Sequence, residues 1–373
     1  MTFAEAGSGR RGGEDVRGRG EGVRGMAGLP GPGIGGGRAP RLGKLRMAWL
    51  VGLVLVPGCA GAGAGPAAGP GAGPVGGEPA ATVGQTPAGE RSRVILLHDN
   101  DTHLHDNHRE EVRRFVEGVR EAGPSVFLLS AGDVLVRHAG RWPEGEGIEW
   151  YRHEGLRQIE WMNELRYDVM TSGNHELQPH EMVTREILEA ARFPILAANI
   201  RMETDALPRH PPYHVLTTDD GLTLALLGLS VINFDPPPGL VEEEYHQTVE
   251  AYRALAEEHD ALILLNHIGI RYDLELANAF PEVAAIIGGH THSLLPEAIH
   301  VNGVLVAQTG GHHHIRDPES EMTMGVVVLE FEDGALVESC GWVVSIGPGG
   351  VRPAGAFREH RERWDEPIPA CAA

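Results

Sequence analysis

Residues 94–103 read Val-Ile-Leu-Leu-His-Asp-Asn-Asp-Thr-His, an apolar run that passes directly into polar residues. The four apolar residues Val94–Leu97 are typical of a strand buried in an α/β sheet. In such a sheet, ligand-binding side chains project from loops at the carboxyl ends of the strands. This stretch therefore predicts an α/β domain with Asp101 and His103 at the carboxyl edge of its sheet.

Polar motifs of the same kind occur at four further predicted strand ends. They are Gly132-Asp133, Gly173-Asn174-His175-Glu176, Asn266-His267 and Gly288-Gly289-His290-Thr291-His292. Each motif taken singly is also compatible with an ordinary turn or loop. Five of them in succession, rich in Asp, Asn and His, indicate a metal site instead, with glycines that let the backbone approach the ions.

The residue types in these motifs favour two metal ions and hydrolytic chemistry. Nitrogen and oxygen donors without sulfur suit Mn, Zn, Fe or Co, and Asp133 can bridge two ions because a carboxylate has two oxygens. Two adjacent cations stabilise an in-line phosphoryl displacement and lower the pKa of a bridging water, which makes hydroxide available as the nucleophile. His175, next to Asn174, is a candidate either to protonate the leaving oxygen or to stabilise the charge that develops on it.

The rest of the folded part alternates between strand-like and helix-like segments. A charged helix is predicted over residues 109–121, and another over residues 148–165, where apolar residues recur at helical spacing. Further strands are predicted at 125–129, 168–171, 195–198, 222–229, 261–266 and 284–287, followed by a hairpin of 326–331 and 335–344 around Glu332-Asp333-Gly334. This order predicts a mixed sheet with βαβ units.

The overall charge limits the class of substrate. The chain has 373 residues and a formal net charge of −21, and no basic stripe follows Arg93. A nucleic-acid polymer needs such a stripe, whereas a small phosphate can be neutralised by bound metal ions. The sequence therefore argues against nucleic acid and leaves a small phosphorylated substrate, such as a nucleotide.

The first ninety residues indicate export. Basic residues precede the apolar run Met47–Val56, which is too short to span a membrane and ends in Pro57-Gly58-Cys59. Cys59 resembles a lipidated cysteine, although cleavage without lipid is the alternative. We therefore expect a signal segment over 1–59, an Ala/Gly/Pro-rich linker over 60–92, a catalytic domain over 93–346 and a tail over 347–373. A lipid anchor would be the only membrane contact of a periplasmic or outer-membrane lipoprotein.

The motifs, in this order and spacing, resemble the calcineurin-like metallophosphoesterase superfamily and, within it, the 5′-nucleotidase branch. The resemblance rests on residues 98–103, 173–176, 197–199 and 288–292 and extends over about residues 94–346. It implies a four-layer α/β/β/α sandwich of two mixed sheets with a dinuclear metal site at the strand ends. It also implies that one ion is held by Asp101, His103, Asp133 and His292, the other by Asp133, Asn174, His267 and His290, with His175 and Asn174 in catalysis.

Two departures from this branch bear on the substrate. Gln178 stands where the family usually has an aspartate that orients the catalytic histidine, so we expect weaker protonation of the leaving group. The 27 residues after Ile346 cannot form the second domain that binds the nucleobase, so nucleotide specificity does not carry over. A sulfur-ester hydrolase of the thiosulfohydrolase type and a non-catalytic metal-binding lipoprotein remain the alternatives.

Several other residues carry weaker expectations. His98 is expected behind the ligands or simply within its strand, and His105 and His108 are expected to be solvated. His312-His313-His314 is a candidate lining of the pocket, and Arg316 is a candidate contact for phosphate oxygens. Cys340 and Cys371 are candidates for a disulfide in an oxidising compartment.

Overall fold

The computed structural model describes one folded domain within the unit Gly76–Ala373. The described residues are 91–123, 125–136, 145–180, 182–311, 320–354 and 371. The predicted signal segment, Cys59, His312–His314 and Arg316 lie outside the described residues.

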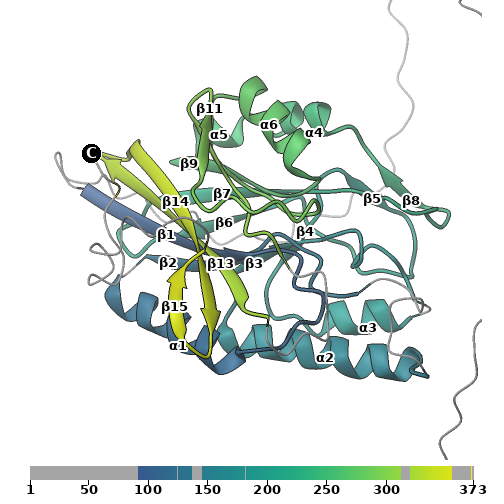
Figure 1. Cartoon of the computed structure of the whole chain (residues 1–373). Helices are drawn as coiled ribbons and strands as arrows, with labels where there is room; N and C mark the ends of the chain where they lie inside the picture. Colours follow the sequence, from purple (N-terminus) through teal and green to yellow (C-terminus); the bar gives the residue numbers. More distant parts are fainter. Residues whose placement is uncertain are drawn as a thin grey trace, which may run out of the picture. The chain divides into compact units, whose positions relative to one another are not determined.

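A seven-stranded mixed sheet carries the first three motifs (Figure 1). Its order is β15-β14-β13-β1-β2-β3-β4. The bounds are β1 Arg91–Asp99, β2 Val126–Ser130, β3 Val169–Thr171, β4 Ile195–Leu196, β13 Met322–Glu332, β14 Ala335–Gly347 and β15 Gly350–Pro353. Strands β1 to β4 are parallel, whereas β13 to β15 pair antiparallel, as the hairpin signal predicts. The sheet continues to Pro353, beyond the expected domain end at residue 346.

A six-stranded sheet carries the other two motifs. Its order is β11-β12-β10-β9-β7-β6, with β6 and β11 antiparallel at the edges and parallel pairs between them. The bounds are β6 Tyr213–Thr217, β7 Thr223–Ser230, β9 Ala261–His267, β10 Val283–Ile287, β11 Ile299–Val301 and β12 Val304–Ala307. Strands β5 Ile200–Met202 and β8 Leu240–Glu242 form a separate ribbon.

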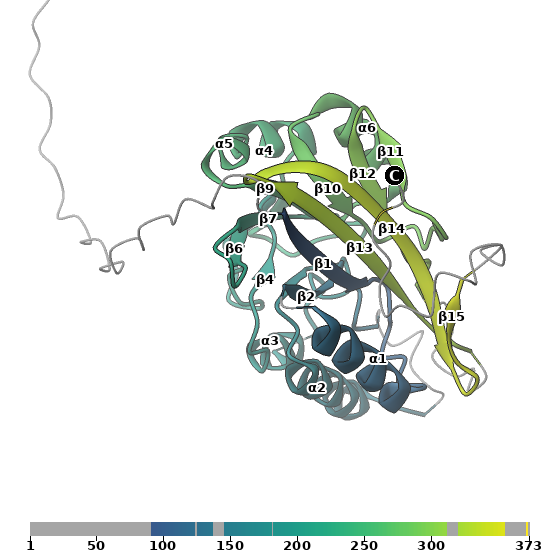
Figure 2. The same cartoon turned by 90° about the vertical axis from the view of Figure 1, so that its left-hand side faces the viewer.

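Helices cover the outer face of each sheet, as the two views show (Figures 1 and 2). The helices α1 Arg109–Ala122, α2 Ile148–Leu165 and α3 Val183–Glu189 cover the first sheet, and α4 Tyr245–Ala251, α5 Leu255–Glu258 and α6 Ile270–Ala279 cover the second. None of the helices in the described ranges is both long and apolar enough to cross a membrane.

Three hydrophobic clusters hold these four layers together. Successive residues of β1 point to opposite faces of the sheet and so belong to different clusters. Leu97 packs in the cluster beneath α1 to α3, and Leu96 packs in the cluster between the two sheets. Leu264 of β9 lies in the third cluster, with Leu276 of α6. Each fully buried side chain of this size contributes about 1.5–3 kcal/mol relative to an exposed one. The expected four-layer α/β/β/α sandwich of two mixed sheets is confirmed.

A disulfide joins Cys340 of β14 to Cys371. Cys371 is buried in the cluster beneath α1 to α3. The two cysteines are 31 residues apart, and closing a loop of this length removes chain entropy from the unfolded state, worth about 3–4 kcal/mol.

We therefore expect Cys371→Ser to lower the free energy of unfolding by about this amount in urea denaturation. Adding a reductant should lower the free energy of unfolding of the wild-type protein by a similar amount and should not change that of the variant. Equal stability of the two proteins under non-reducing conditions would contradict a stabilising role for the disulfide.

Candidate metal centre

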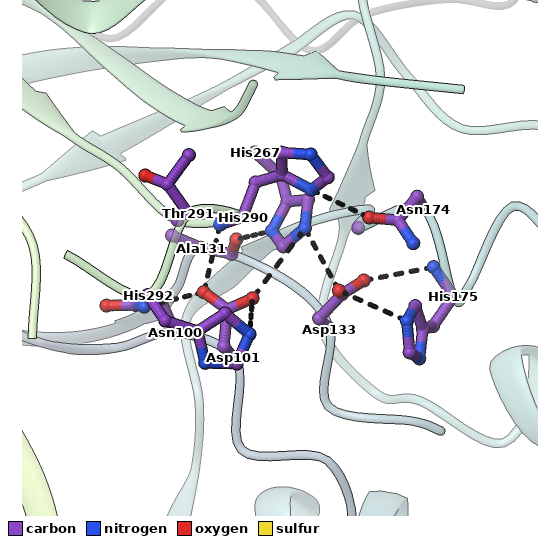
Figure 3. A network of polar contacts seen from close by, with 12 residues as sticks. Asn100, Asp101, Ala131, Asp133, Asn174, His175, His267, His290, Thr291 and His292 are labelled. Carbon is purple, nitrogen blue, oxygen red and sulfur yellow. Dashed lines mark hydrogen bonds and ion pairs between the residues drawn. The ribbon is translucent and has the colours of Figure 1, made fainter. Parts of the chain in front are cut away.

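The carboxyl ends of five strands from both sheets meet at one place (Figure 3). Strands β1, β2 and β3 bring their motifs from the first sheet, and β9 and β10 bring theirs from the second. The seven predicted metal ligands and His175 all lie here. Three groups of side chains are spaced so that each can hold a metal ion: Asp101, His103 and His292; His103, Asp133 and His175; and Asp133, His267 and His290.

The first group is built around one buried carboxylate oxygen. Oδ1 of Asp101 is buried and accepts no hydrogen bond from the described part of the chain. It nevertheless lies 3.2 Å from Nε2 of His292 and 3.9 Å from Nε2 of both His103 and His267. Nε2 of His103 and Nε2 of His292 are 3.2 Å apart. Donor atoms that converge in this way, with an acceptor that lacks a hydrogen bond, fit a cation between them.

The other oxygen of Asp101 fixes the direction of the carboxylate. Oδ2 accepts a hydrogen bond from the side-chain amide of Asn100 at 2.6 Å and another from the backbone N–H of His290 at 2.9 Å. The Asn100 side chain is held in turn by the backbone N–H and the hydroxyl of Thr309. These contacts leave Oδ1 directed at the histidine rings.

The third group, with His267 and His290, is centred on Asp133. Its Oδ2 lies 3.2 Å from Nε2 of His267, and Nδ1 of His290 lies 2.9 Å from Oδ1 of Asn174. Oδ1 of Asp133 accepts the backbone N–H of His175 at 2.9 Å. Oδ2 is therefore the oxygen of Asp133 that faces the donors of both sheets.

His175 reaches the same carboxylate from the opposite side (Figure 3). Its Nε2 lies 3.6 Å from Oδ2 of Asp133, and the ring is tilted against that of His103 with the centroids 4.8 Å apart. The side chain of His175 is 10% exposed, close to the 12% and 13% of His103 and His292. His175 thus lies beside His103 at the edge of the Asp133 carboxylate, and its ring is about as buried as those of His103 and His292.

Backbone carbonyls orient two of the rings. Nδ1 of His103 lies 3.1 Å from the carbonyl of Leu135, and Nδ1 of His267 lies 2.6 Å from the carbonyl of Ala131. A carbonyl oxygen only accepts hydrogen bonds, so Nδ1 carries a proton in both rings and donates it to the carbonyl. Nε2 is then the nitrogen that faces the carboxylates and is available to a metal ion. Both rings are therefore oriented as metal ligands require.

The charges of the site are strongly coupled. Burial would raise the pKa of Asp133, but the rings of His267, His175 and His103 more than offset it and hold this pKa well below the ordinary value. Burial would lower the pKa of His267, but Asp133 and Asp101 raise it to about 10. This raised pKa favours a proton on the His267 ring in the metal-free protein, which a metal ion would have to displace.

The backbone is strained where the ligands are attached. Five of the candidate ligands have a positive φ: Asp101 (54°), His103 (50°), Asp133 (54°), His290 (78°) and His292 (50°). Such a conformation is costly for residues other than glycine, on the order of 1–3 kcal/mol each, and is concentrated at functional sites. Gly173 is required for a different reason, since a Cβ there would lie 2.0 Å from Oδ1 of Asp133.

The Glu176 carboxylate organises the loops rather than the chemistry. Its two oxygens accept backbone N–H groups from Asp133, Leu135 and Gly173 at 2.7–2.9 Å. Both oxygens of Glu176 are therefore engaged by the backbone of the ligand loops. At Gln178, where the family has an aspartate, the backbone N–H donates to the carbonyl of His175 at 3.3 Å.

Other histidines named from the sequence lie outside the three groups. His98 is buried in β1 against Gly325 of β13, and burial lowers its pKa to about 3. The expectation that His105 is solvated is wrong, because its ring is buried and its Nε2 lies 3.1 Å from the hydroxyl of Ser320. The sequence carried no signal for this contact, because Ser320 is 215 residues away.

The fold and the site together define a metallophosphoesterase domain. The model of the family "Calcineurin-like phosphoesterase" matches residues 96–294, which include every residue of the three groups. The chain belongs to the calcineurin-like phosphoesterase family. The family expected from the sequence, the calcineurin-like metallophosphoesterases, is confirmed.

Comparisons with individual proteins agree with this family. The chain is 27% identical over 227 residues to the uncharacterized metallophosphoesterase YunD of Bacillus subtilis (strain 168), covering 58% of this chain and 47% of the relative. It is 29% identical over 192 residues to the 5′-nucleotidase of Homo sapiens, covering 48% and 32%. The chain thus spans less than half the length of either relative.

A solved structure shows the same fold. The crystal structure of a 5′-nucleotidase precursor from Thermus thermophilus matches with a TM-score of 0.55 at 23% identity. The match covers 69% of this chain and 55% of the other. At 23% sequence identity, this likeness shows a shared fold alone.

Proposed function

We propose that the protein is a dinuclear-metal phosphoesterase that hydrolyses small phosphate esters in the manner of a 5′-nucleotidase. The observation that carries the proposal is the convergence of five strand ends on three groups of metal-capable side chains, two of which contain Asp133. One ion would be held by Asp101, His103, Asp133 and His292. The other would be held by Asp133, Asn174, His267 and His290, and Mn, Zn, Fe or Co suits these donors.

The bound ions would supply positive charge to the phosphoryl oxygens and an acidified water as the nucleophile. The protein itself has four further tasks. Asp133 would belong to both ligand sets, and the loops of both sheets keep the site buried on the protein side. His175 donates a proton to the leaving oxygen, and Asn174 beside it would orient the substrate and hold metal.

A nucleotide is the substrate class that the relatives favour. The human relative is named a 5′-nucleotidase, as is the solved structure from Thermus thermophilus. Both are much longer than the matched region, so a nucleobase pocket is not part of the proposal.

We further propose that the protein acts outside the cytoplasm, anchored through a lipid on Cys59 with residues 60–92 as linker. The signal-like segment before Cys59 supports export. The disulfide between Cys340 and Cys371 also supports it, because such bonds persist in oxidising compartments.

The proposed activity predicts complete dependence on divalent metal. Chelation with EDTA should lower phosphate release by about 10³-fold or more, since each metal function is worth several kcal/mol. Adding Mn²⁺ or Zn²⁺ should restore it. The measurement is phosphate release by the full chain from AMP, a UDP-sugar, a cyclic nucleotide and an aryl phosphodiester side by side.

The outcome also separates the alternatives. Turnover of AMP but not of the diesters would support the nucleotidase assignment, and the reverse would support a phosphodiesterase. An absence of turnover on the whole panel, with two metal ions bound per chain, would reject the phosphoesterase proposal in favour of a sulfur-ester hydrolase or a binding protein.

A further inference from the structure

A buried carboxylate lies directly behind the ligand loops of the second sheet. Asp273, on α6, is fully buried. It belongs to none of the three groups that can hold a metal ion. The covering helix of the second sheet therefore places an acidic group where it cannot contact a substrate but can act on the loops that carry the ligands.

Both oxygens of this carboxylate are used by side-chain amides. Oδ1 accepts the Nδ2–H of Asn266 at 2.9 Å, and Oδ2 accepts the Nε2–H of Gln308 at 2.7 Å. Asn266 directly precedes His267 at the end of β9, and Gln308 directly follows β12. A carboxylate is the side chain that can accept from two amide donors at once, because both its oxygens are acceptors.

The contacts continue from Gln308 into the loop that carries His290 and His292. Nε2 of Gln308 also lies 3.5 Å from the carbonyl of Gly289, and Oε1 of Gln308 accepts the hydroxyl of Thr291 at 3.4 Å. The same hydroxyl accepts the backbone N–H of Ile270 at the start of α6, at 3.1 Å. Helix α6 thus holds this loop at two points.

The loop also packs tightly on the carboxylate itself. A Cβ at Gly288 would lie 2.1 Å from Oδ2 of Asp273 and 2.7 Å from Nε2 of Gln308. The first glycine of the Gly-Gly-His-Thr-His motif is therefore required by Asp273, whereas a Cβ on the second, Gly289, would lie 2.9 Å from Nδ1 of His267.

We propose that Asp273 is a positioning residue for the metal centre: through Asn266, Gln308 and Gly288 it holds the segments that carry His267, His290 and His292 at the distance that metal binding needs. The inference rests on the proposed function, because it takes these histidines as metal ligands. Partners behind a ligand typically change metal affinity 10- to 100-fold when they are removed.

The test is Mn²⁺ binding to the metal-free full chain, measured by isothermal titration calorimetry for wild type, Asp273→Asn and Asp273→Ala. We expect both variants to bind Mn²⁺ about 10- to 100-fold more weakly, with the larger loss in Asp273→Ala. Asn at 273 retains one acceptor but sets its own NH₂ against one of the two amides, so its loss should be smaller. Glu275→Gln, on the exposed surface of the same helix, should bind like wild type.

A second variant tests the route of the effect. The single variants Asp273→Ala and Gln308→Ala are compared with the double variant Asp273→Ala/Gln308→Ala. If Asp273 acts through Gln308, the double variant should bind Mn²⁺ only slightly more weakly than whichever single variant binds it less tightly, because the effects of coupled residues are not additive. Thermal unfolding of the metal-free proteins shows whether a variant binds Mn²⁺ weakly because its ligands are displaced or because it is unfolded. We expect Asp273→Asn to be folded at the titration temperature.

The outcomes are distinguishable. Wild-type affinity in a folded Asp273→Asn and in Asp273→Ala would overturn the positioning role and leave the proposed function standing. An equal loss in Glu275→Gln would also overturn it. Failure of the wild-type chain to bind Mn²⁺ and equally to bind Zn²⁺, Fe²⁺ or Co²⁺ would reject both the inference and the proposed function.

Discussion

Asp133→Asn is expected to lower kcat/KM for the best phosphate ester by about 10³-fold or more, since loss of even one metal function removes several kcal/mol of transition-state stabilisation. The two oxygens of this carboxylate have different partners. Oδ1 accepts the backbone N–H of His175, and Oδ2 faces Nε2 of His267 at 3.2 Å. An asparagine must keep its carbonyl towards the His175 N–H, so its NH₂ would point at the histidine ring and at the cations.

The measurement combines phosphate release with metal content per chain. We expect fewer than two ions to remain bound to Asp133→Asn, because its NH₂ cannot donate an electron pair to a metal. Asp219→Asn is the matched control, since Asp219 is exposed on the turn before β7. Full activity with two bound ions in Asp133→Asn would reject Asp133 as the shared ligand.

The sequence allowed the convergence of the candidate ligands to be predicted because these residues follow recognisable apolar runs. The run Val94–Leu97 is so strongly apolar that β1, and with it the place of Asp101 and His103, follows from composition alone. The helices 109–121 and 148–165 were predicted almost to their observed ends at Ala122 and Leu165, because their apolar faces are regular.

Elements whose structure depends on distant partners were not predicted. The ribbon β5–β8 pairs Ile200–Met202 with Leu240–Glu242, and neither segment is long enough to show a period. The short helices α4 and α5 have seven and four residues, too few for helical spacing to be distinguished from chance. Tertiary packing, rather than local preference, determines these elements.

The residues behind the ligands were missed for the same reason. Asp273 lies 35 residues from Gln308, and neither stands in a motif. The loop function of Glu176 was also not evident, because its partners are backbone N–H groups that carry no sequence signal. Candidate ligands can be predicted from their residue type and their position after a strand. The groups that orient them can be identified only once the fold is known.

The second large effect is expected at His175, and it should depend on the leaving group. His175→Ala should lower kcat for AMP by about 10²- to 10⁴-fold, which is the range for the loss of a general acid. For p-nitrophenyl phosphate the loss should be much smaller, because p-nitrophenolate leaves without protonation. Steady-state kinetics on both substrates measures the difference.

Metal content decides between two roles for this ring. His175 lies in a metal-capable group with His103 and Asp133, and its Nε2 is 3.6 Å from Oδ2 of Asp133. As a proton donor it can be removed without loss of metal, so His175→Ala should bind as many ions as wild type. His153→Ala is the control, because that side chain is 73% exposed on α2. If His175→Ala instead loses an ion and kcat falls equally for both substrates, His175 is a metal ligand. Another group must then donate the proton to the leaving oxygen.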